Sequence, residues 1–486
     1  MGDALGVSPM GARDALSDRL GTTPPLGGTM SIETTPVDTR PLRASFAGSV
    51  IAPGDPGWDA ARQAFNVTVD QRPALIAVAQ DARDVAAVMR FASERGLRVA
   101  PQATGHNAAP LGDLGATILL KTSAMTGFTV DAATRRARVE AGVKWGPVVD
   151  AASAHGLAPL AGSARDVGVV GYSLGGGLGW LGRKHGLQAN ALTAVELVTP
   201  DGALVRADHE REPELFWALR GGGGNFGVVT AVEFELFPLA QVYAGSLFFP
   251  FEQGGEVLHA WREWGATVPD ELTTTAKLLQ LPPLEELPEP LRGRSFALLQ
   301  FAFLGGEADG AELTAPLRAL GPVMDTTAMV EPAALSYLAM DPEDPMPYAC
   351  HSQLLGDMPA QGLDAFLAHT GPGSGSELIV AELRLLGGAL ARTHDSHGVR
   401  DTLPGGYLTF LVGGLPDPAL RPALERRFER VHRSIAMYQL GEYVNFAERP
   451  TRPDRLWEEH KLDRLRTVRQ QWDPRGVLHA NHGLGA

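Results

Sequence analysis

The chain has 486 residues, of which 44% are hydrophobic and 20% are charged, and its formal net charge is −14. Length and composition are typical of a globular protein of two or three domains, and they argue against a disordered or membrane-embedded chain. The acidic balance argues against nucleic acid or an anionic membrane as a partner, because both bind to basic surfaces.

The N-terminal stretch, residues 1–44, is rich in Gly, Pro, Thr and Asp and contains no apolar run long enough for a signal peptide or a membrane span. We expect a disordered leader, in which Met30 is an alternative start to Met1. Cys350 is the single cysteine, so no intramolecular disulfide, thiolate zinc site or iron–sulfur cluster can form. These features predict a cytoplasmic protein without a metal site.

A first folded domain is predicted over residues 45–240. A strand at 73–79, an amphipathic helix at 81–95 and a strand at 97–100 form a β-α-β unit, with Asp81 and Gly96 as helix caps. Later elements are predicted by the same patterns: strands at 116–120, 136–142, 193–198, 203–206 and 227–236, and a helix at 146–155.

Composition changes after residue 240. Alternating strands at 243–249, 296–303, 378–386 and 406–413 are separated by long Pro-rich loops, which indicates an antiparallel sheet covered by helices. This second domain is predicted over 241–440. A C-terminal segment, 441–486, contains a helix at 454–471. The fold class is therefore predicted to be α+β.

Three glycine-rich segments stand out, at residues 104–112, 168–179 and 219–228. Each offers runs of backbone N–H groups with few intervening side chains, which is how a protein cradles an anionic pyrophosphate without a lysine. Asn225 and Phe226 are expected to shape the third segment, and Arg183 and Lys184 to form a solvated basic turn.

Two motif matches offer alternatives. Gly171-Tyr-Ser-Leu-Gly175 fits the G-x-S-x-G pattern of a serine hydrolase with Ser173 as nucleophile, but that motif needs a strand before it and a packed helix after it. Here Ser173 leads directly into three glycines. Residues 177–182 fit the G-x-G-x-x-G dinucleotide pattern, although the acidic residue expected about 20 positions later is only loosely available.

The order of these glycine segments, with Arg183-Lys-His-Gly-Leu187 and Tyr443-Val-Asn-Phe446, resembles the FAD-linked oxidases of the berberine-bridge-enzyme family. The resemblance implies a two-part FAD-binding domain of the PCMH type, as in vanillyl-alcohol oxidases, and an α+β substrate domain. It also implies that the C-terminal segment returns to the FAD domain, and that the cofactor is FAD.

In that family, the histidine of the first glycine loop is bonded to the 8α-methyl group of the flavin, and His106 occupies its position. Many relatives add a second bond from a cysteine, but Ala164 stands there, so the resemblance implies a single attachment through His106. The other cofactor-binding residues that it implies are Thr104, Gly105, Asn107, Gly162, Val167, Gly168, Gly171, Tyr172, Gly175, Gly176, Gly177, Gly227, Val228 and Asn445.

The chemistry implied is the transfer of a hydride from a small-molecule substrate to the flavin. Tyr443 is the expected base, with its pKa lowered near the electron-poor ring, and aromatic packing is the alternative role for it. Asn445 is expected to anchor substrate or flavin. Val167 stands where valine accompanies oxidases, so O2 is the expected acceptor. The substrate stays open among alcohols, sugars and secondary metabolites, with amine oxidation or C–C bond formation in natural-product biosynthesis as the alternative.

Overall fold

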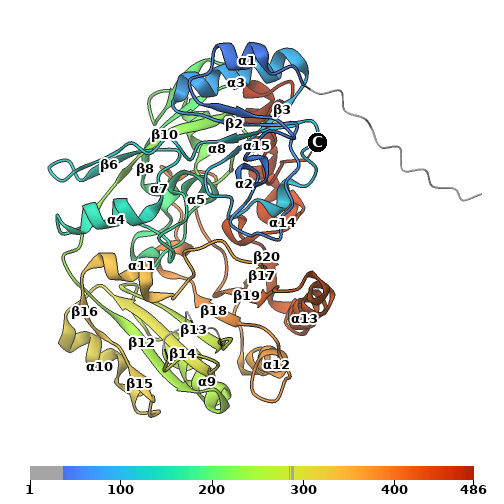
Figure 1. Cartoon of the computed structure of the whole chain (residues 1–486). Coiled ribbons are helices and arrows are strands. Elements are labelled where there is room, and N and C mark those ends of the chain that lie inside the picture. The colour runs from blue at the N-terminus through green and yellow to red at the C-terminus, as the bar shows by residue number, and fades with distance from the viewer. Residues whose placement is uncertain (1–36, 284, 286–288, 486) are drawn as a thin grey trace, which may run out of the picture. The chain divides into compact units, whose positions relative to one another are not determined.

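The computed structural model describes residues 37–283, 285 and 289–485 (Figure 1). Most of the predicted leader, including Met30, lies outside the described residues. Within its last residues, however, Arg40–Ala44 form helix α1, and Leu42 is buried in a core cluster. The described chain is therefore already folded before residue 45.

The first sheet has the strand order β1-β2-β4-β3, formed by Ser49–Ile51, Leu75–Val78, Thr117–Lys121 and Arg98–Gln102. Strands β2, β4 and β3 are parallel, and helix α3 (Ala82–Arg95) connects β2 to β3. The carboxylate of Asp81 caps α3 by accepting from the backbone N–H groups of Arg83 and Asp84, and Gly96 ends the helix with a φ of 65°. The predicted β-α-β unit and both of its caps are confirmed.

The second sheet is antiparallel, with the order β5-β6-β10-β8-β9. Its strands are Phe128–Asp131, Arg136–Glu140, Val228–Glu235, Leu192–Val198 and Leu204–Ala207. Helices α4 (Trp145–Ser153), α5 (Val169–Gly175) and α8 (Pro213–Leu219) share one hydrophobic core with it, built around Trp145 and Phe234. The short helices nearby are α2 (Trp58–Ala61), α6 (Gly182–His185) and α7 (Gln188–Ala191), and β7 (Leu157–Ala158) pairs with β11 (Phe237–Pro238).

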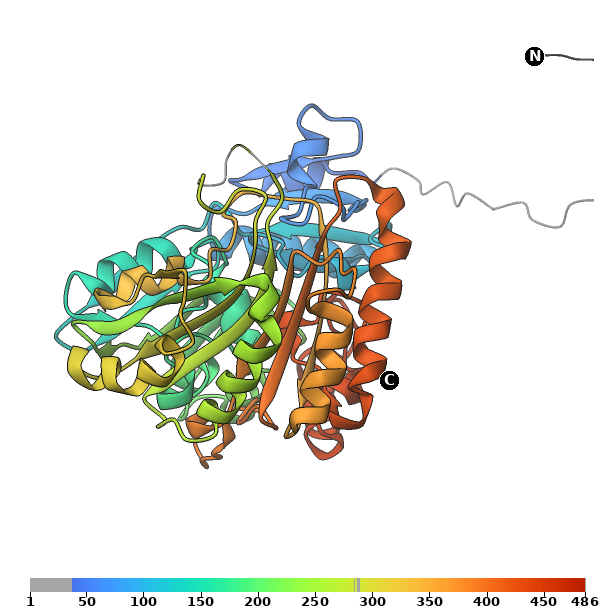
Figure 2. The ribbon, with the colours of Figure 1, turned by 90° about the horizontal axis from the view of Figure 1, so that it is seen from below.

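The third sheet contains nine strands and is antiparallel throughout. Its order is β15 (Met324–Asp325), β12 (Val242–Pro250), β14 (Ser295–Phe303), β13 (Leu272–Gln280), β18 (Val380–Leu385), β19 (Tyr407–Gly414), β17 (Tyr348–Leu355) and β20 (Gln439–Gly441); β16 (Ala328–Val330) also pairs with β12. Helices cover one of its faces (Figures 1 and 2): α9 (Gly254–Gly265), α10 (Glu307–Arg318), α12 (Ala360–Thr370) and α13 (Arg421–Ser434). The predicted α+β class is confirmed.

The C-terminal segment returns to the first two sheets, where α15 packs against α8 (Figure 1). The single helix predicted over 454–471 is in fact two helices, α14 (Pro453–Leu456) and α15 (Glu459–Trp472). The break occurs at Trp457, whose backbone is extended. Its side chain is buried, and its indole N–H donates to the carbonyl of Gly221 at 3.0 Å. The domain boundaries at 240/241 and 440/441 stay predictions, because the described chain clusters as one unit.

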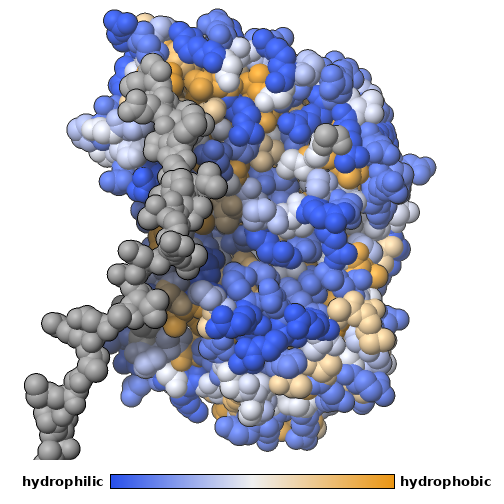
Figure 3. Space-filling model, turned by 90° about the vertical axis from the view of Figure 1, so that its right-hand side faces the viewer, coloured by the Kyte–Doolittle hydropathy of each residue, from blue (hydrophilic) through white to orange (hydrophobic). Residues whose placement is uncertain are grey.

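Hydrophilic side chains cover much of the face shown in Figure 3, with hydrophobic residues in smaller patches between them. Among the described residues, no helix combines the length and apolarity that crossing a bilayer requires.

Candidate active site

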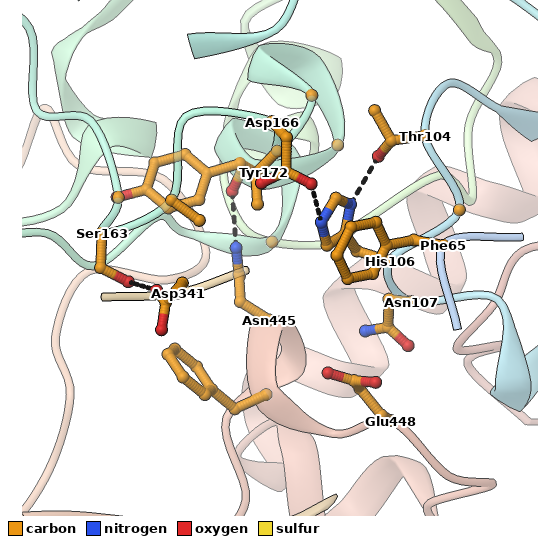
Figure 4. Close-up of a pocket in the computed structure, with 18 of the residues that line it drawn as sticks. Phe65, Thr104, His106, Asn107, Ser163, Asp166, Tyr172, Asp341, Asn445 and Glu448 are labelled. Atoms are coloured by element: carbon orange, nitrogen blue, oxygen red, sulfur yellow. Dashed lines mark hydrogen bonds and ion pairs between the residues drawn. The ribbon is translucent and has the colours of Figure 1, made fainter. Parts of the chain in front are cut away.

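A cavity of about 710 Å³ lies between the glycine-rich segments and the third sheet (Figure 4). The first part of the chain contributes the loop at 101–107, the stretch 162–175 and glycines of the third segment. The sheet contributes residues of β13, β17, β18 and β19, and the C-terminal segment contributes 444–446, Glu448 and 479–481. Regions far apart in sequence thus meet around one space, whose volume suits a bound organic molecule.

His106 projects into this cavity from the loop that follows β3. Its ring stacks on Phe65 with centroids 3.8 Å apart and planes 16° apart. Its Nδ1 lies 2.8 Å from Oγ1 of Thr104, and its Nε2 lies 2.9 Å from Oδ2 of Asp166. Gly105 precedes it with a φ of 82°, a conformation that favours glycine and turns the chain sharply. The imidazole is therefore held on three sides.

The second glycine segment follows the loop 162–168 and forms helix α5. An added Cβ at Gly175 would lie 2.2 Å from Oδ1 of Asn445, so this glycine lets the C-terminal segment approach the helix. At Gly171, by contrast, an added Cβ would meet nothing within 4 Å, so the backbone there faces open space. Gly224, in the third segment, is equally open. Gly171 and Gly224 thus leave space along the cavity wall that a side chain would fill.

Several buried acceptors in the cavity wall have no hydrogen-bond partner among the described residues. They are Oδ1 of Asn107, Oδ1 of Asn445 and Oδ1 of Asp166, whose Oδ2 contacts His106. The amide N–H groups of the two asparagines are used, since Asn107 donates to Val444 and Asn445 donates to Tyr172. Buried acceptors are rarely left unpaired, so they call for donors on a bound molecule. An FAD offers ring and adenine N–H groups and ribityl hydroxyls, and the residues present fit it.

The third sheet places a buried cluster of charges in the cavity wall. The carboxylate of Glu382 lies between Nζ of Lys277, at 3.3 Å, and the guanidinium of Arg384, which donates to it. Burial alone raises the pKa of Glu382, but the charges of Arg384 and Lys277 outweigh burial and lower it. The guanidinium of Arg384 also stacks on Phe446, 4.9 Å from its ring centroid. Glu382 is consequently an ionised carboxylate between two cations.

A second carboxyl group, Glu448, lines the cavity near Asn107 (Figure 4). Its Oε2 accepts a hydrogen bond from the hydroxyl of Tyr348 at 2.7 Å. Burial raises the pKa of Glu448 to about 7, although the contacts with Tyr348 and Cys350 lower it somewhat. Glu448 therefore exchanges its proton near neutral pH.

Most predicted site residues line the cavity, but four do not. Tyr443 is fully buried among leucines behind Gly176, and burial raises its pKa instead of lowering it. Its position does not support the expected role as a base. Gly176 and Gly177 have positive φ angles and pack against Tyr443 and Tyr172, and Val228 belongs to the core under the sheets. Tyr172 lines the cavity, and its hydroxyl donates to the carbonyl of Leu160.

The structure also rules out both motif alternatives and corrects one expectation. Ser173 is buried inside α5 and donates to the carbonyl of Val169 at 2.8 Å, so it is not the exposed nucleophile of a hydrolase. Residues 177–182 follow a helix instead of a strand, which rules out the dinucleotide pattern there. Arg183 is not solvated: it is buried and donates to the carbonyl of Leu272.

The prediction missed the charged residues of the cavity wall. Glu382 and Arg384 alternate with apolar residues in β18, so their shared face of the strand was a readable signal. Asp166 lies two residues before the second glycine segment and was not predicted as a site residue. Nothing local marks Phe65, Lys277 or Glu448, because the long-range folding of the chain brings them to the cavity.

Comparison with known proteins gives matches at both ends of the chain. A model of the FAD binding domain matches residues 73–208, and a model described as berberine and berberine-like matches residues 442–485. The (R)-6-hydroxynicotine oxidase of Paenarthrobacter nicotinovorans is 40% identical over 195 residues, which span 40% of this chain and 43% of that protein.

Solved structures match over nearly the whole chain. The 6-hydroxy-D-nicotine oxidase from Arthrobacter nicotinovorans is 26% identical, with a TM-score of 0.75 over 91% of this chain and 98% of that chain. Glucooligosaccharide oxidase from Acremonium strictum, whose FAD is described as 6-S-cysteinyl and 8α-N1-histidyl, has the same fold at 22% identity, with a TM-score of 0.72 over 90% of this chain and 97% of that chain. The chain thus carries an FAD binding domain and a berberine-like C-terminal domain, and it is an FAD-linked oxidoreductase.

Proposed function

We propose that the protein is an oxidase that takes a hydride from a small-molecule substrate and holds its FAD by a single covalent bond to His106, with O2 as the electron acceptor. When bound, FAD supplies the hydride acceptor. The observation that carries the proposal is that His106 and the charged cluster of β13 and β18 line the same cavity. One cavity can therefore hold the cofactor at the histidine and present a substrate to it from the sheet.

The position of the single cysteine supports a single covalent attachment of the flavin. Ala164 lines the cavity, whereas Cys350 lies in β17 and is not among the residues that line it. The glucooligosaccharide oxidase has both a cysteinyl and a histidyl link. In this chain only the histidyl link has a matching residue.

The cavity wall supports a compact substrate with one polar end. Apart from the charged cluster, the wall formed by the third sheet and its neighbouring loop is largely apolar, comprising Leu279, Leu281, Leu291, Ile379, Val380, Phe410 and Val412. An oligosaccharide needs polar partners along its whole length, and this wall offers few. An alcohol or amine on an apolar body fits better, and two similar proteins are named as oxidases of a hydroxynicotine.

Glu382 is the side chain best placed to receive a proton from the substrate. It is ionised between Lys277 and Arg384, and it lies on the sheet that faces the glycine-rich loops. Lys277 and Arg384 hold the substrate's polar group beside it. Asn445 orients the flavin through its free amide oxygen, and Val167, which also lines the cavity, leaves room for O2.

An absorbance spectrum before and after acid precipitation tests the proposal. Wild-type protein should keep its yellow colour in the pellet, and His106→Ala should release all of its flavin into the supernatant. With a substrate, each turnover in air should yield one hydrogen peroxide. Complete release of FAD from wild-type protein would refute the covalent link, and turnover without peroxide would refute O2 as the acceptor.

A further inference from the structure

We propose that Asp166 is a positioning residue for the attachment of FAD: it keeps the proton of His106 on Nε2, so that Nδ1 offers its electron pair to the 8α-carbon of the flavin. This inference rests on the proposed attachment through His106. It assigns to Asp166 a task that precedes substrate turnover and is separate from it.

The contacts of the imidazole define which nitrogen is free. Asp166 and Thr104 approach different edges of the ring (Figure 4). An ionised carboxylate can only accept a hydrogen bond, so the 2.9 Å contact with Oδ2 of Asp166 favours a proton on Nε2. The hydroxyl of Thr104 can then donate to Nδ1 at 2.8 Å and rotate away from it. Nδ1 is consequently the nitrogen with an available electron pair.

Because Asp166 is buried, its contact with His106 matters for the stability of its negative charge. The residue is only 5% exposed; among the described residues its Oδ1 has no hydrogen-bond partner, and its Oδ2 contacts the ring of His106. A buried carboxylate without donors is costly, so a nearby N–H group or a developing positive charge stabilises it strongly. His106, stacked on Phe65, presents Nε2 to it in a fixed orientation.

The attachment balances with O2 as the oxidant. A bond forms between Nδ1 and the 8α-carbon, one C–H bond of the 8α-methyl group breaks, and the imidazole loses its Nε2 proton. Both hydrogens and two electrons remain on the flavin, which is thereby reduced; O2 then removes them as hydrogen peroxide. Asp166 stabilises the positive charge that develops on the imidazole while the bond forms, and it relays the Nε2 proton, which ends on the reduced flavin together with the hydrogen from the methyl group.

The loop that carries Asp166 is held by its backbone, so its shape does not depend on this side chain. The N–H of Trp145 donates to the carbonyl of Val167, and the N–H of Gly146 donates to the carbonyl of Arg165. Arg165 is further fixed by an ion pair with Asp150. Variants of Asp166 should therefore fold, and Asp150→Asn is a matched control that removes a neighbouring carboxylate without touching His106.

The experiment starts from full-length apoprotein produced in riboflavin-starved cells, to which FAD is added in air. Acid-stable flavin and peroxide are followed over time for wild type, Asp166→Asn, Asp166→Ala and Asp150→Asn. We expect attachment to slow about 100-fold in Asp166→Ala, in the range of a lost general base. Asp166→Asn should slow about tenfold, because its amide oxygen still accepts from Nε2 but carries no charge. Asp150→Asn should match wild type.

Two further readouts separate positioning from a structural role. All variants should bind FAD non-covalently in a 1:1 ratio and melt within a few degrees of wild type. ¹⁵N NMR of His106 should show the Nε2–H tautomer in wild-type apoprotein and a mixture in Asp166→Ala. Attachment at the wild-type rate in Asp166→Ala, loss of non-covalent FAD binding in Asp166→Asn, or a wild-type Nδ1–H tautomer would each overturn the inference. A wild-type protein without acid-stable flavin would instead refute the attachment itself.

Discussion

Two carboxyl groups in the cavity wall respond to burial in opposite ways. Glu382 is paired with Arg384 and Lys277, and their charges hold its pKa below the usual value despite burial. Among the described residues, Glu448 has the neutral partners Tyr348 and Cys350, and burial raises its pKa to about 7. When their surroundings shift the pKa values of two carboxyl groups in opposite directions, the two groups can take different roles. Glu382 stays ionised to accept a proton, whereas Glu448 is mostly protonated below neutral pH.

Kinetics of Glu382→Gln and Tyr443→Phe distinguish the two candidate bases. Removing the carboxylate of Glu382 should lower the rate of flavin reduction by substrate by about 10² to 10⁴-fold, as expected for a lost general base. Tyr443→Phe should leave that rate almost unchanged, because Tyr443 is fully buried and lies outside the cavity lining. Anaerobic stopped-flow, normalised to bound flavin, measures both. A large loss in Tyr443→Phe alone would return the role to the tyrosine.

The raised pKa of Glu448 predicts a pH-dependent stability. Its folded-state pKa of about 7 exceeds the usual value of 4.5 for a glutamate, so the folded protein binds this proton more tightly than the unfolded chain. The resulting stabilisation is complete below about pH 4.5 and is lost as the pH rises to about 7. Relative to wild type, Glu448→Gln should therefore gain stability between pH 5 and pH 8, by at most about 3 kcal/mol.

Urea unfolding of flavin-free protein at both pH values measures this gain. Glu425→Gln is a useful control, because its carboxylate pairs with His351 outside the cavity and its pKa is lowered instead of raised. Because the pKa of Glu425 in the folded protein lies below 4.5, its contribution to stability is almost complete at pH 5, and the difference between Glu425→Gln and wild type should stay nearly constant from pH 5 to pH 8. A pH-independent difference between Glu448→Gln and wild type would show that Glu448 is already ionised in the folded protein.

At the scale of elements, local chemistry made the first sheet predictable. Asp81 and Gly96 mark the ends of α3, and the glycine segments mark backbone that lines the cavity. The strands of the third sheet could also be predicted from their alternating pattern, but the register between them could not. Strands β13 and β18 are neighbours although about 100 residues separate them, so the pairing of Lys277 with Glu382 depends on the whole fold. The break before α15 likewise depends on where the side chain of Trp457 is buried.

Helix α5 offers a matched pair of glycines. Gly175→Ala should destabilise the protein by about 1–3 kcal/mol, since its Cβ would lie 2.2 Å from Oδ1 of Asn445 and would push the C-terminal segment away. Gly171→Ala should be neutral or stabilising by up to about 1 kcal/mol, because an added Cβ meets nothing and alanine favours the helix. Thermal unfolding of flavin-free protein compares them. Equal effects would mean that Asn445 moves freely.

At the scale of the whole molecule, the cavity exists only while the glycine-rich loops and the third sheet stay together. Arg183 of α6 directly connects the glycine-rich part of the chain to the third sheet. Its Nε donates to the carbonyl of Leu272 at 2.8 Å, and its Nη1 donates to the carbonyl of Leu386, at the ends of two central strands. The neighbouring Lys184 forms an ion pair with Glu271 that is exposed to solvent. Two adjacent cations thus contact the same sheet, one buried and one exposed.

We expect Arg183→Met to lower the free energy of unfolding by about 2–4 kcal/mol, because it leaves two buried carbonyl groups without donors. Lys184→Met should change it by no more than about 1 kcal/mol, the usual contribution of an exposed ion pair. Urea unfolding measures both, and limited proteolysis shows whether the sheet separates from the loops first. If Arg183 joins the two parts, its variant should become sensitive to protease at residues between them before global unfolding, and its flavin should lose protection from solvent quenchers. Equal stability of the two variants would mean that the apolar contacts around α6 hold the cavity closed without Arg183.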